Sequence, residues 1–280
     1  MLARQGRRRF EMNQIDTLVR GRRSVRTYDE RAIAPQDMEK LLVFMEKIDN
    51  PYGLPIEFRL LDAKKQKLSC PVVVGTDVYV GAKMKKAPHL NEAIGYSFEK
   101  MVLFAQSLGI GTVWVGGTMD RSAFERAMEL RDDEVMPCVS PLGYPAKRMS
   151  LRETMMRKGI KADDRLAFEK LFFDGSFDKP LSQASAGKLG HALEMVRLAP
   201  SAVNKQPWRI VLEDHAAHFY LLRSKGFGGG VLDMQKIDMG IALCHFDLAV
   251  QAVGLCPKLI EMDPGLSANS GEEYIATYQF

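Results

Sequence analysis

The segment Arg22–Arg26, with the sequence Arg-Arg-Ser-Val-Arg, places three guanidinium groups and one hydroxyl within five residues. It follows Ile15–Gly21, whose apolar spacing predicts a short helix. Guanidinium groups offer forked hydrogen-bond donors that match phosphate oxygens, and a serine hydroxyl adds a neutral donor. The segment therefore predicts a site for a phosphorylated small molecule. Taken alone, it is also compatible with a solvated basic face.

A second polar segment lies far along the chain, at Ala199–Trp208, with the sequence Ala-Pro-Ser-Ala-Val-Asn-Lys-Gln-Pro-Trp. Its small residues let a backbone approach a flat ring, and Ser201 and Asn204 can hydrogen-bond to the edge of a heterocycle. A helix stop followed by a tryptophan that anchors the core would produce the same pattern.

Two further segments place glycines after predicted strands. Trp114–Gly117 ends in two glycines, and Pro141–Pro145 reads Pro-Leu-Gly-Tyr-Pro. Glycine at such a point lets backbone amides contact a ligand closely, although plain turns have the same composition. His215 and His218 are spaced as His-x-x-His, but no cysteine or carboxylate cluster of ligand spacing accompanies them, so no metal site is expected.

Helices and short strands alternate along the chain, which predicts an α+β fold. Helices are expected at 15–21, from Pro35 to about Met45, at 91–108, from about Arg121, at 186–198 and at 238–254. Strands are expected at 56–61, 72–80 and 112–115, up to about Pro141, at 207–213 and 217–222, and near Leu259 and Tyr274. A basic stretch, Lys147–Arg165, separates the elements up to about Pro141 from those that begin at residue 186.

The order of elements recurs in the second half of the chain. An offset of 152 residues places Pro55 on Pro207, and an offset of 145 places Gly95 on Gly240. Unrelated helix–strand units can align this well by chance. We hypothesise two degenerate copies of a helix-flanked mixed or antiparallel sheet unit, packed through long central helices. The boundaries are a disordered basic tail at 1–11, a first half at 12–165 and a second half at 166–280.

Composition restricts the class of protein. The 280 residues are 46% hydrophobic and 26% charged with a net charge of +4, which is typical of a globular protein. The arginines gather in short segments without interleaved aromatics, which argues against a nucleic-acid partner. No apolar run approaches the roughly 20 residues of a membrane span, and residues 1–11 lack the apolar segment of a secretory signal. Four separated cysteines favour reduced thiols and a cytoplasmic protein.

Taken together, the motifs resemble those of the FMN-dependent nitroreductase family. The resemblance rests on Arg22–Arg26, Ala199–Trp208, Leu-Gly-Ile-Gly-Thr-x-Trp at 108–114 and Leu-Gly-Tyr-Pro-Ala at 142–146, and it extends over nearly the whole chain from about Asp16. It implies a nitroreductase-like fold and an FMN that exchanges hydride with NAD(P)H. Family members are homodimers with FMN at the subunit interface, where the partner subunit supplies the Pro-Ser-x-x-Asn segment.

The resemblance also implies which residues hold the phosphate and ribityl chain of FMN. These are Arg22, Arg23, Ser24, Arg26 and, further along the chain, Arg165. Family members commonly carry a basic residue two positions before this last arginine, whereas this chain has Asp163, so the match departs from the pattern there.

The flavin ring is implied to lie between two segments. Gly116 and Gly117 would face its redox-active edge, and Pro200, Ser201, Ala202 and Asn204 would line it. No catalytic side chain is expected, because the cofactor carries the chemistry.

The two distinctive motifs fall in different halves of the chain, whereas one subunit of an ordinary family member carries both. The offset of 152 places Tyr52 on Asn204, and it places Asp174 and Asp178 on Arg22 and Arg26. Carboxylates at a second phosphate position would repel a dianion. We therefore expect a monomer that acts as an internal pseudo-dimer with one FMN.

The expected activity is that of an FMN-dependent oxidoreductase, which takes hydride from NAD(P)H and passes electrons to a small electron-poor acceptor such as a nitroaromatic or a quinone. Two alternatives stay open: a non-catalytic FMN-binding carrier or sensor, and a nitroreductase-fold enzyme with other flavin chemistry. The run Gly226–Gly230 does not match a nucleotide-binding fingerprint and is interpreted as a flexible loop.

Overall fold

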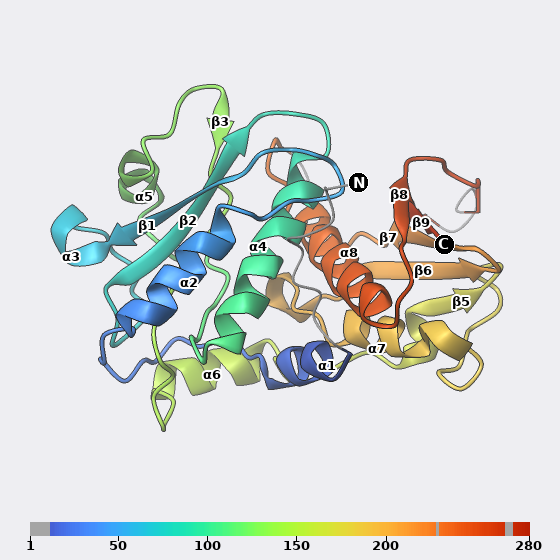
Figure 1. Ribbon diagram of the computed structural model, residues 1–280, viewed down its shortest axis with the longest axis horizontal. Helices are drawn as coiled ribbons and strands as arrows, with labels where there is room; N and C mark the ends of the chain where they lie inside the picture. The colour runs from blue at the N-terminus through green and yellow to red at the C-terminus, as the bar shows by residue number, and fades with distance from the viewer. Residues whose placement is uncertain (1–11, 228–229, 267–270) are drawn as a thin grey trace, which may run out of the picture.

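The computed structural model describes residues 12–227, 230–266 and 271–280. The expected tail at 1–11 and part of the run Gly226–Gly230 lie outside the described residues. Two sheets stand on opposite sides of a pair of long crossing helices, with shorter helices around them (Figure 1). The expected α+β class is therefore confirmed.

The helices begin and end close to most of the expected positions. They are α1 (Met12–Gly21), α2 (Pro35–Met45), α3 (Ala63–Gln66), α4 (Leu90–Ser107), α5 (Arg121–Ala127), α6 (Leu151–Gly159), α7 (Gly190–Arg197) and α8 (Met234–Ala252). Short 3-10 helices lie at Phe168–Lys170, Gly187–Leu189 and Ala202–Asn204. The strands are β1 (Glu57–Asp62), β2 (Val78–Lys85), β3 (Glu134–Val135), β4 (Val139–Pro141), β5 (Phe172–Asp174), β6 (Trp208–Glu213), β7 (Ala216–Leu221), β8 (Lys258–Ile260) and β9 (Glu273–Gln279).

The first sheet is antiparallel and is built around β2, which pairs with β1, β3 and β4. The strand expected at 72–80 is wrong over residues 72–77, because β2 begins at Val78. Before that point the chain turns at Gly75, whose φ is +86°, and Val74 bridges Thr27. A Cβ at Gly75 would lie 2.3 Å from the Tyr28 carbonyl oxygen, so this turn packs directly on the segment that follows Arg26.

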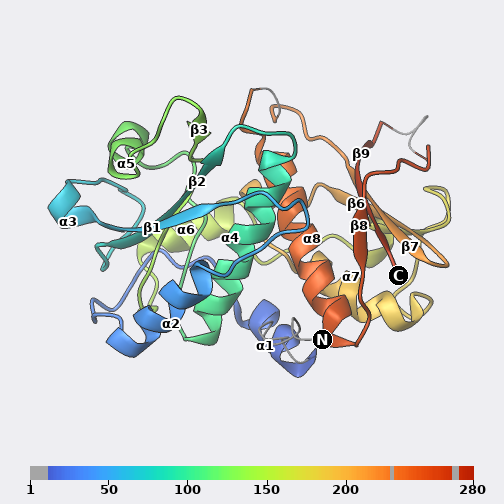
Figure 2. The same cartoon turned by 45° about the horizontal axis from the view of Figure 1, so that its top comes forward.

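The second sheet has the order β5-β6-β7-β9-β8. The expected hairpin is formed by β6 and β7, and β9 and β8 continue it in antiparallel fashion. Strand β5 pairs with β6 in parallel, with Phe172 opposite Ile210. Figure 2 shows this sheet on the far side of α8 from the first sheet.

The long helices α4 and α8 cross between the sheets at a pair of glycines (Figure 1). A Cβ on Gly95 would lie 2.1 Å from the Ile237 carbonyl oxygen, and one on Gly240 would lie 2.1 Å from the Glu92 carbonyl oxygen. The contact is reciprocal, because the offset of 145 carries Glu92 to Ile237 as well as Gly95 to Gly240. Each helix thus approaches the backbone of the other where it has no side chain.

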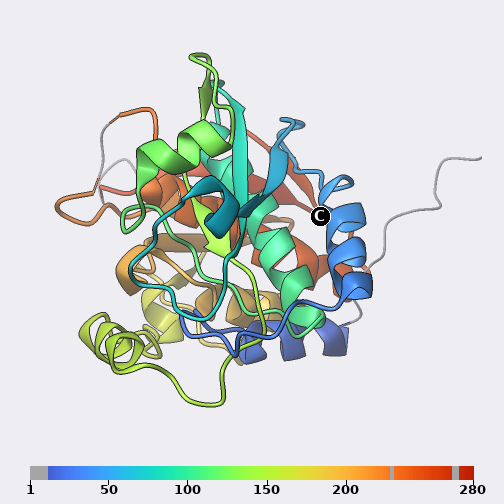
Figure 3. The same cartoon turned by 90° about the vertical axis from the view of Figure 1, so that its left-hand side faces the viewer.

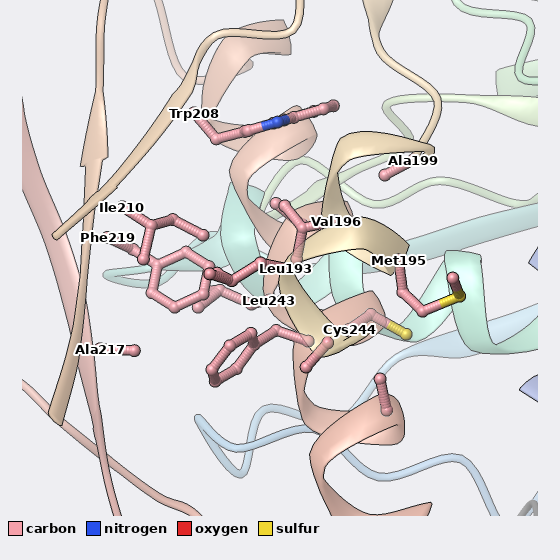
Figure 4. Packing of buried hydrophobic residues seen from close by; sticks show 14 of the residues in the cluster. Leu193, Met195, Val196, Ala199, Trp208, Ile210, Ala217, Phe219, Leu243 and Cys244 are labelled. Carbon is pink, nitrogen blue, oxygen red and sulfur yellow. The ribbon is translucent and has the colours of Figure 1, made fainter. Parts of the chain in front are cut away.

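Apolar side chains of α7 and α8 pack on the inner face of β6 and β7 (Figure 4). Leu193 and Val196 of α7 lie beside Leu243 of α8, and Phe219 of β7 completes the layer. Trp208 is fully buried at the start of β6, so the tryptophan of the second polar segment is a core residue. This packing orients the turn at 199–206 that precedes β6.

Two further segments differ from the elements expected from the sequence. Residues 112–115 form isolated bridges and no strand, because Thr112 pairs with Ser24 and Val115 pairs with Val139 on different neighbours. The basic stretch contains α6, which Ser150 caps by accepting a hydrogen bond from the Glu153 amide at 3.2 Å. Figure 3 shows α6 (yellow-green) along the same side of the molecule as α1 (dark blue). Within the described ranges, no helix is long and apolar enough to cross a membrane.

Candidate functional site

Four arginine side chains lie close enough to influence one another electrostatically. Arg22 and Arg26 follow α1, Arg157 lies on α6, and Arg165 follows α6. Burial is the main factor that lowers the pKa of Arg22 and of Arg26, and the charge of Arg157 lowers both further, while Glu99 and Glu153 oppose the shifts. The pKa of Arg165 is likewise lowered by burial first and then by Arg22. The four arginines outnumber the three carboxylates beside them, Glu99, Glu153 and Asp163, so the cluster would favour a bound anion.

Several nitrogen atoms of this cluster are buried without a partner. They are Nε of Arg22, Nε and Nη1 of Arg26, and Nε of Arg165, none of which has a hydrogen-bond partner among the described residues. Arg22 forms a long ion pair, in which its Nε lies 4.0 Å from Oε1 of Glu99, beyond hydrogen-bonding range. Buried, unpaired cationic donors destabilise a fold. An anion that filled the cluster would remove that cost.

Arg23 differs from its neighbours in the same motif. Its Nη1 donates to Oε1 of Glu153 at 2.9 Å, and the Thr27 hydroxyl donates to Oε2 of the same carboxylate at 2.8 Å. The Glu153 side chain is fully buried. Arg23 therefore links α6 to the 22–27 segment. The sequence motif by itself does not distinguish this arginine from Arg22 and Arg26. Ser24 bridges Thr112, which holds the segment against the 112–115 stretch.

The predicted ring-lining turn is strained. Val203, Asn204 and Gln206 have φ angles of +43°, +58° and +50°, in the region that favours glycine. The Ser201 hydroxyl accepts a hydrogen bond from the Gln206 amide at 2.8 Å, and the Ala202 amide donates to Oδ1 of Asp238 at 2.9 Å. Such strain persists where surrounding contacts enforce it, and it concentrates at functional sites.

Asn204 joins this turn to the arginine cluster. Its Nδ2 donates to the Lys161 carbonyl at 2.6 Å and to the Asp164 carbonyl at 3.0 Å, and its Oδ1 accepts from Nη1 of Arg165 at 3.3 Å. The structure thus brings together Arg22, Arg165 and the turn that begins at Pro200, although they are widely separated in sequence. The polar atoms of Asn204 serve internal hydrogen bonds, so a ring-lining role for it stays a prediction.

Gly116 and Gly117 form an open turn beyond Val115. The Gly116 carbonyl accepts from Nη2 of Arg121 at 2.5 Å, while neither glycine amide donates to a backbone group in the described part of the chain. Gly117 is exposed, and a Cβ there would have no heavy atom within 4 Å. Two amides are therefore free to donate to a ligand that lies on this turn.

A buried polar network connects this turn to the arginine cluster through Glu99, whose side chain is 0% exposed. Its Oε2 accepts from the Trp114 indole at 3.0 Å, and its Oε1 lies 3.0 Å from Nε2 of His245. The other imidazole nitrogen, Nδ1, lies 2.9 Å from the Met195 carbonyl and must donate to it, because a carbonyl only accepts. His245 of α8 therefore joins α7 through the Met195 carbonyl and α4 through the Glu99 carboxyl.

Asp238 is a further buried carboxyl beside the strained turn. Burial raises its pKa well above the ordinary value, Asp233 raises it further and the hydrogen bond from the Ala202 amide opposes the shift. Its Oδ2 has no partner in the described ranges. Asp238, Glu99 and Arg157 were missed as site residues by the sequence analysis. Carboxylates on otherwise apolar helices, and the Ser-x-x-Glu capping pattern at Ser150, were the available signals.

We expect Asp238→Asn to stabilise the protein at neutral pH. A carboxyl whose folded pKa is raised contributes stability that is complete below its unfolded pKa of about 3.9 and is lost as the pH rises through the folded pKa. Asparagine keeps an acceptor for the Ala202 amide and removes the charge. The expected change at pH 7 is a rise in Tm of roughly 2–4 °C, or about 1 kcal/mol, shrinking toward zero near pH 4.

The measurement is Tm by differential scanning fluorimetry between pH 4 and 8. The control is Asp214→Asn, which removes an exposed carboxylate in the β6–β7 turn and should leave Tm nearly unchanged. A fall in Tm for Asp238→Asn at pH 7 would show that the carboxylate is ionised and supported in the folded protein.

The chain is similar to known proteins both in sequence and in fold. Residues 14–250 match the family described as "Putative TM nitroreductase". A putative nitroreductase from Thermotoga maritima MSB8 has a similar structure, with a TM-score of 0.61 at 18% identity, covering 100% of this chain and 99% of that one. No curated protein matches the chain.

Two other solved structures resemble a smaller part of the chain. A nitroreductase family protein from Clostridium novyi NT has a TM-score of 0.42 at 17% identity over 48% of this chain and 86% of its own. An FMN-dependent nitroreductase from Clostridium difficile R20291 has a TM-score of 0.41 at 17% identity over 51% of this chain and 95% of its own.

Proposed function

This chain belongs to the nitroreductase family, and from that membership we propose that it is an FMN-dependent oxidoreductase. Family membership supports an oxidoreductase in general. Our proposal is more specific: NAD(P)H donates hydride, and a small electron-poor acceptor such as a nitroaromatic or a quinone receives the electrons. Bound FMN would supply this redox chemistry, and the protein would supply position and electrostatics.

The observation that carries the proposal is the set of buried, unpartnered nitrogens on Arg22, Arg26 and Arg165. A phosphate dianion offers several acceptor oxygens, and charge-assisted hydrogen bonds from guanidinium are among the strongest in proteins. The donor set therefore fits the phosphate of FMN in both charge and number. Arg157, whose charge acts on all three, would add to the favourable potential.

The Gly116–Gly117 turn and the strained turn at 201–206 supply the surroundings that a flavin ring needs. The free amides of the two glycines can donate to the ring edge, and the absence of Cβ atoms permits close approach. The small residues Pro200 and Ala202 leave the other turn open to a flat ring. Glu99 accepts a hydrogen bond from the Trp114 indole, which fixes the 112–115 stretch from which Gly116 departs.

We also propose that the halves 12–165 and 166–280 form an internal pseudo-dimer that binds one FMN and acts as a monomer. The reciprocal contact of Gly95 and Gly240 supports this, as does the origin of the two motifs in different halves. The offset that places Asp174 on Arg22 is not matched by their positions in the fold. Asp174 lies in β5 beside Leu212, whereas Arg22 follows a helix, so the two occupy unlike surroundings.

The test is to extract and quantify flavin from the purified chain, and then to add NADH or NADPH anaerobically while recording the flavin absorbance. We expect close to one FMN per chain and rapid bleaching by at least one nucleotide. One FMN that neither nucleotide reduces would favour the carrier or sensor. A value near two would overturn the single site, and no binding of added FMN would overturn the cofactor.

A further inference from the structure

A cavity of about 420 Å³ lies apart from the arginine cluster, between the start of α4 and β8. Three segments line it: residues 51–54 after α2, Pro88 and His89 before α4, and residues 259–261 at the end of β8. This volume lies within the range of small-molecule sites and suits a molecule of one or two rings. The residues of these segments give the cavity both apolar walls and polar groups.

Two of the three lining segments are the counterparts of segments around the proposed flavin ring. An offset of 152 carries 51–54 to 203–206, and an offset of 145 carries 259–261 to 114–116 and 88–89 to 233–234. The cavity therefore occupies the second ring position of the proposed pseudo-dimer. The lining differs between the two positions. Tyr52 occupies the place of Asn204, and Glu261 occupies the place of Gly116.

These replacements form a polar end to the cavity. The Tyr52 ring stacks on the His89 imidazole, with ring centroids 5.1 Å apart and an interplanar angle of 8°. Nε2 of His89 lies 3.1 Å from Oε2 of Glu261, whose side chain is 48% exposed. Pro51, Leu54 and Ile260 contribute apolar surface.

One polar atom at this end has no hydrogen-bond partner in the described part of the chain, and the backbone beside it is strained. The Tyr52 hydroxyl is buried and has no partner among the described residues. His89 has a φ of +58°, a strained conformation for a non-glycine residue, at the first position before α4. Burial raises the pKa of Tyr52, and the charges of Glu92 and Glu261 raise it further, so the phenol stays neutral.

We propose that this cavity binds a small aromatic molecule that carries a protonated amine. The aromatic ring would lie against the proline and leucine walls, and the ammonium would donate to the Tyr52 hydroxyl and the Glu261 carboxylate. This is the reverse of the charge preference at the arginine cluster. Binding of the amine does not depend on FMN as the cofactor, because no residue of the arginine cluster lines this cavity.

The experiment measures the binding of three probes of similar size to the full-length purified protein by ligand-observed NMR and calorimetry. They are 2-phenylethylamine, 2-phenylethanol and 3-phenylpropionate, each tested with and without saturating FMN. We expect the amine to bind with a Kd on the order of millimolar, as its few heavy atoms allow. The alcohol should bind about tenfold more weakly, and the carboxylate should not bind measurably.

Two variants locate the binding. Glu261→Gln should remove the preference for the amine over the alcohol. Tyr52→Phe should weaken amine binding about fivefold without loss of stability, because the hydroxyl it removes has no partner. Glu46→Gln, which removes an exposed carboxylate after α2, is the matched control and should bind like the unmodified protein.

Several results would overturn the proposal. They are no binding of the amine, equal binding of the carboxylate, unchanged amine preference in Glu261→Gln, or displacement of the amine by FMN. The last would place the amine at the flavin site. Failure to bind FMN at all would overturn the proposed function and leave this result intact.

Discussion

Arg26→Gln is expected to weaken FMN binding while it stabilises the flavin-free protein. In the absence of an anion, Arg26 is a partly buried cation whose Nε and Nη1 atoms are buried and have no partner in the described chain, so removing its charge removes a destabilising contribution. With FMN bound, the same change removes charge-assisted hydrogen bonds. At about 1.5–3 kcal/mol for bonds to a charged group, the FMN Kd should rise roughly 10- to 150-fold.

The matched variant is Arg23→Gln, in the same motif three residues earlier. Arg23 already pairs with Glu153 at 2.9 Å, and the Glu153 carboxylate is fully buried. Its loss should lower the unfolding free energy of the flavin-free protein by about 1–2 kcal/mol, a value reduced because Arg23 is partly exposed. FMN affinity should change less than in Arg26→Gln.

Both variants are measured by fluorescence titration with FMN and by urea unfolding of the flavin-free protein. Opposite signs of the stability change in the two variants would support the division of the motif into a ligand-binding and a structural arginine. If Arg23→Gln lost FMN and Arg26→Gln kept it, the roles within the motif would be reversed.

Gly95→Ala is expected to damage the fold more than any substitution considered above. The new Cβ would lie 2.1 Å from the Ile237 carbonyl oxygen and 3.0 Å from the Gly240 Cα, both backbone atoms that cannot rotate away. Helices α4 and α8 would have to separate, and both sheets pack on this pair. We expect a loss of about 3 kcal/mol or more, the upper range for overpacking and a large part of the usual 5–15 kcal/mol.

Gly159→Ala is the control for this prediction. Gly159 ends α6, and a Cβ there would meet no heavy atom within 4 Å. Alanine at this position should leave stability unchanged or raise it by up to about 1 kcal/mol. Soluble yield and urea midpoints compare the two variants. A Gly95→Ala protein with the midpoint of the unmodified chain would mean that α4 and α8 do not cross this closely.

Much of the fold followed from local patterns in the sequence. Apolar periodicity located α2, and apolar runs located α4 and the two strands of the β6–β7 hairpin, because these elements bury most of their own side chains in the core. Pairing Gly95 with Gly240 identified the glycines that meet at the helix crossing. The strand expected at 72–80 was partly wrong, because its first residues pack on the 22–28 segment and do not pair with β1.

The amino-acid sequence by itself determined the α+β class, the nitroreductase resemblance and the two motifs that would hold a flavin. The tertiary structure alone decided which members of those motifs are available to a ligand. Arg23 is paired because Glu153 lies beside it, 130 residues away in the chain, whereas Nε and Nη1 of Arg26 have no hydrogen-bond partner among the described residues. The availability of a charged side chain depends on its neighbours in space, and residues that local sequence does not relate, such as Glu99 and His245, are brought together only when the long helices pack.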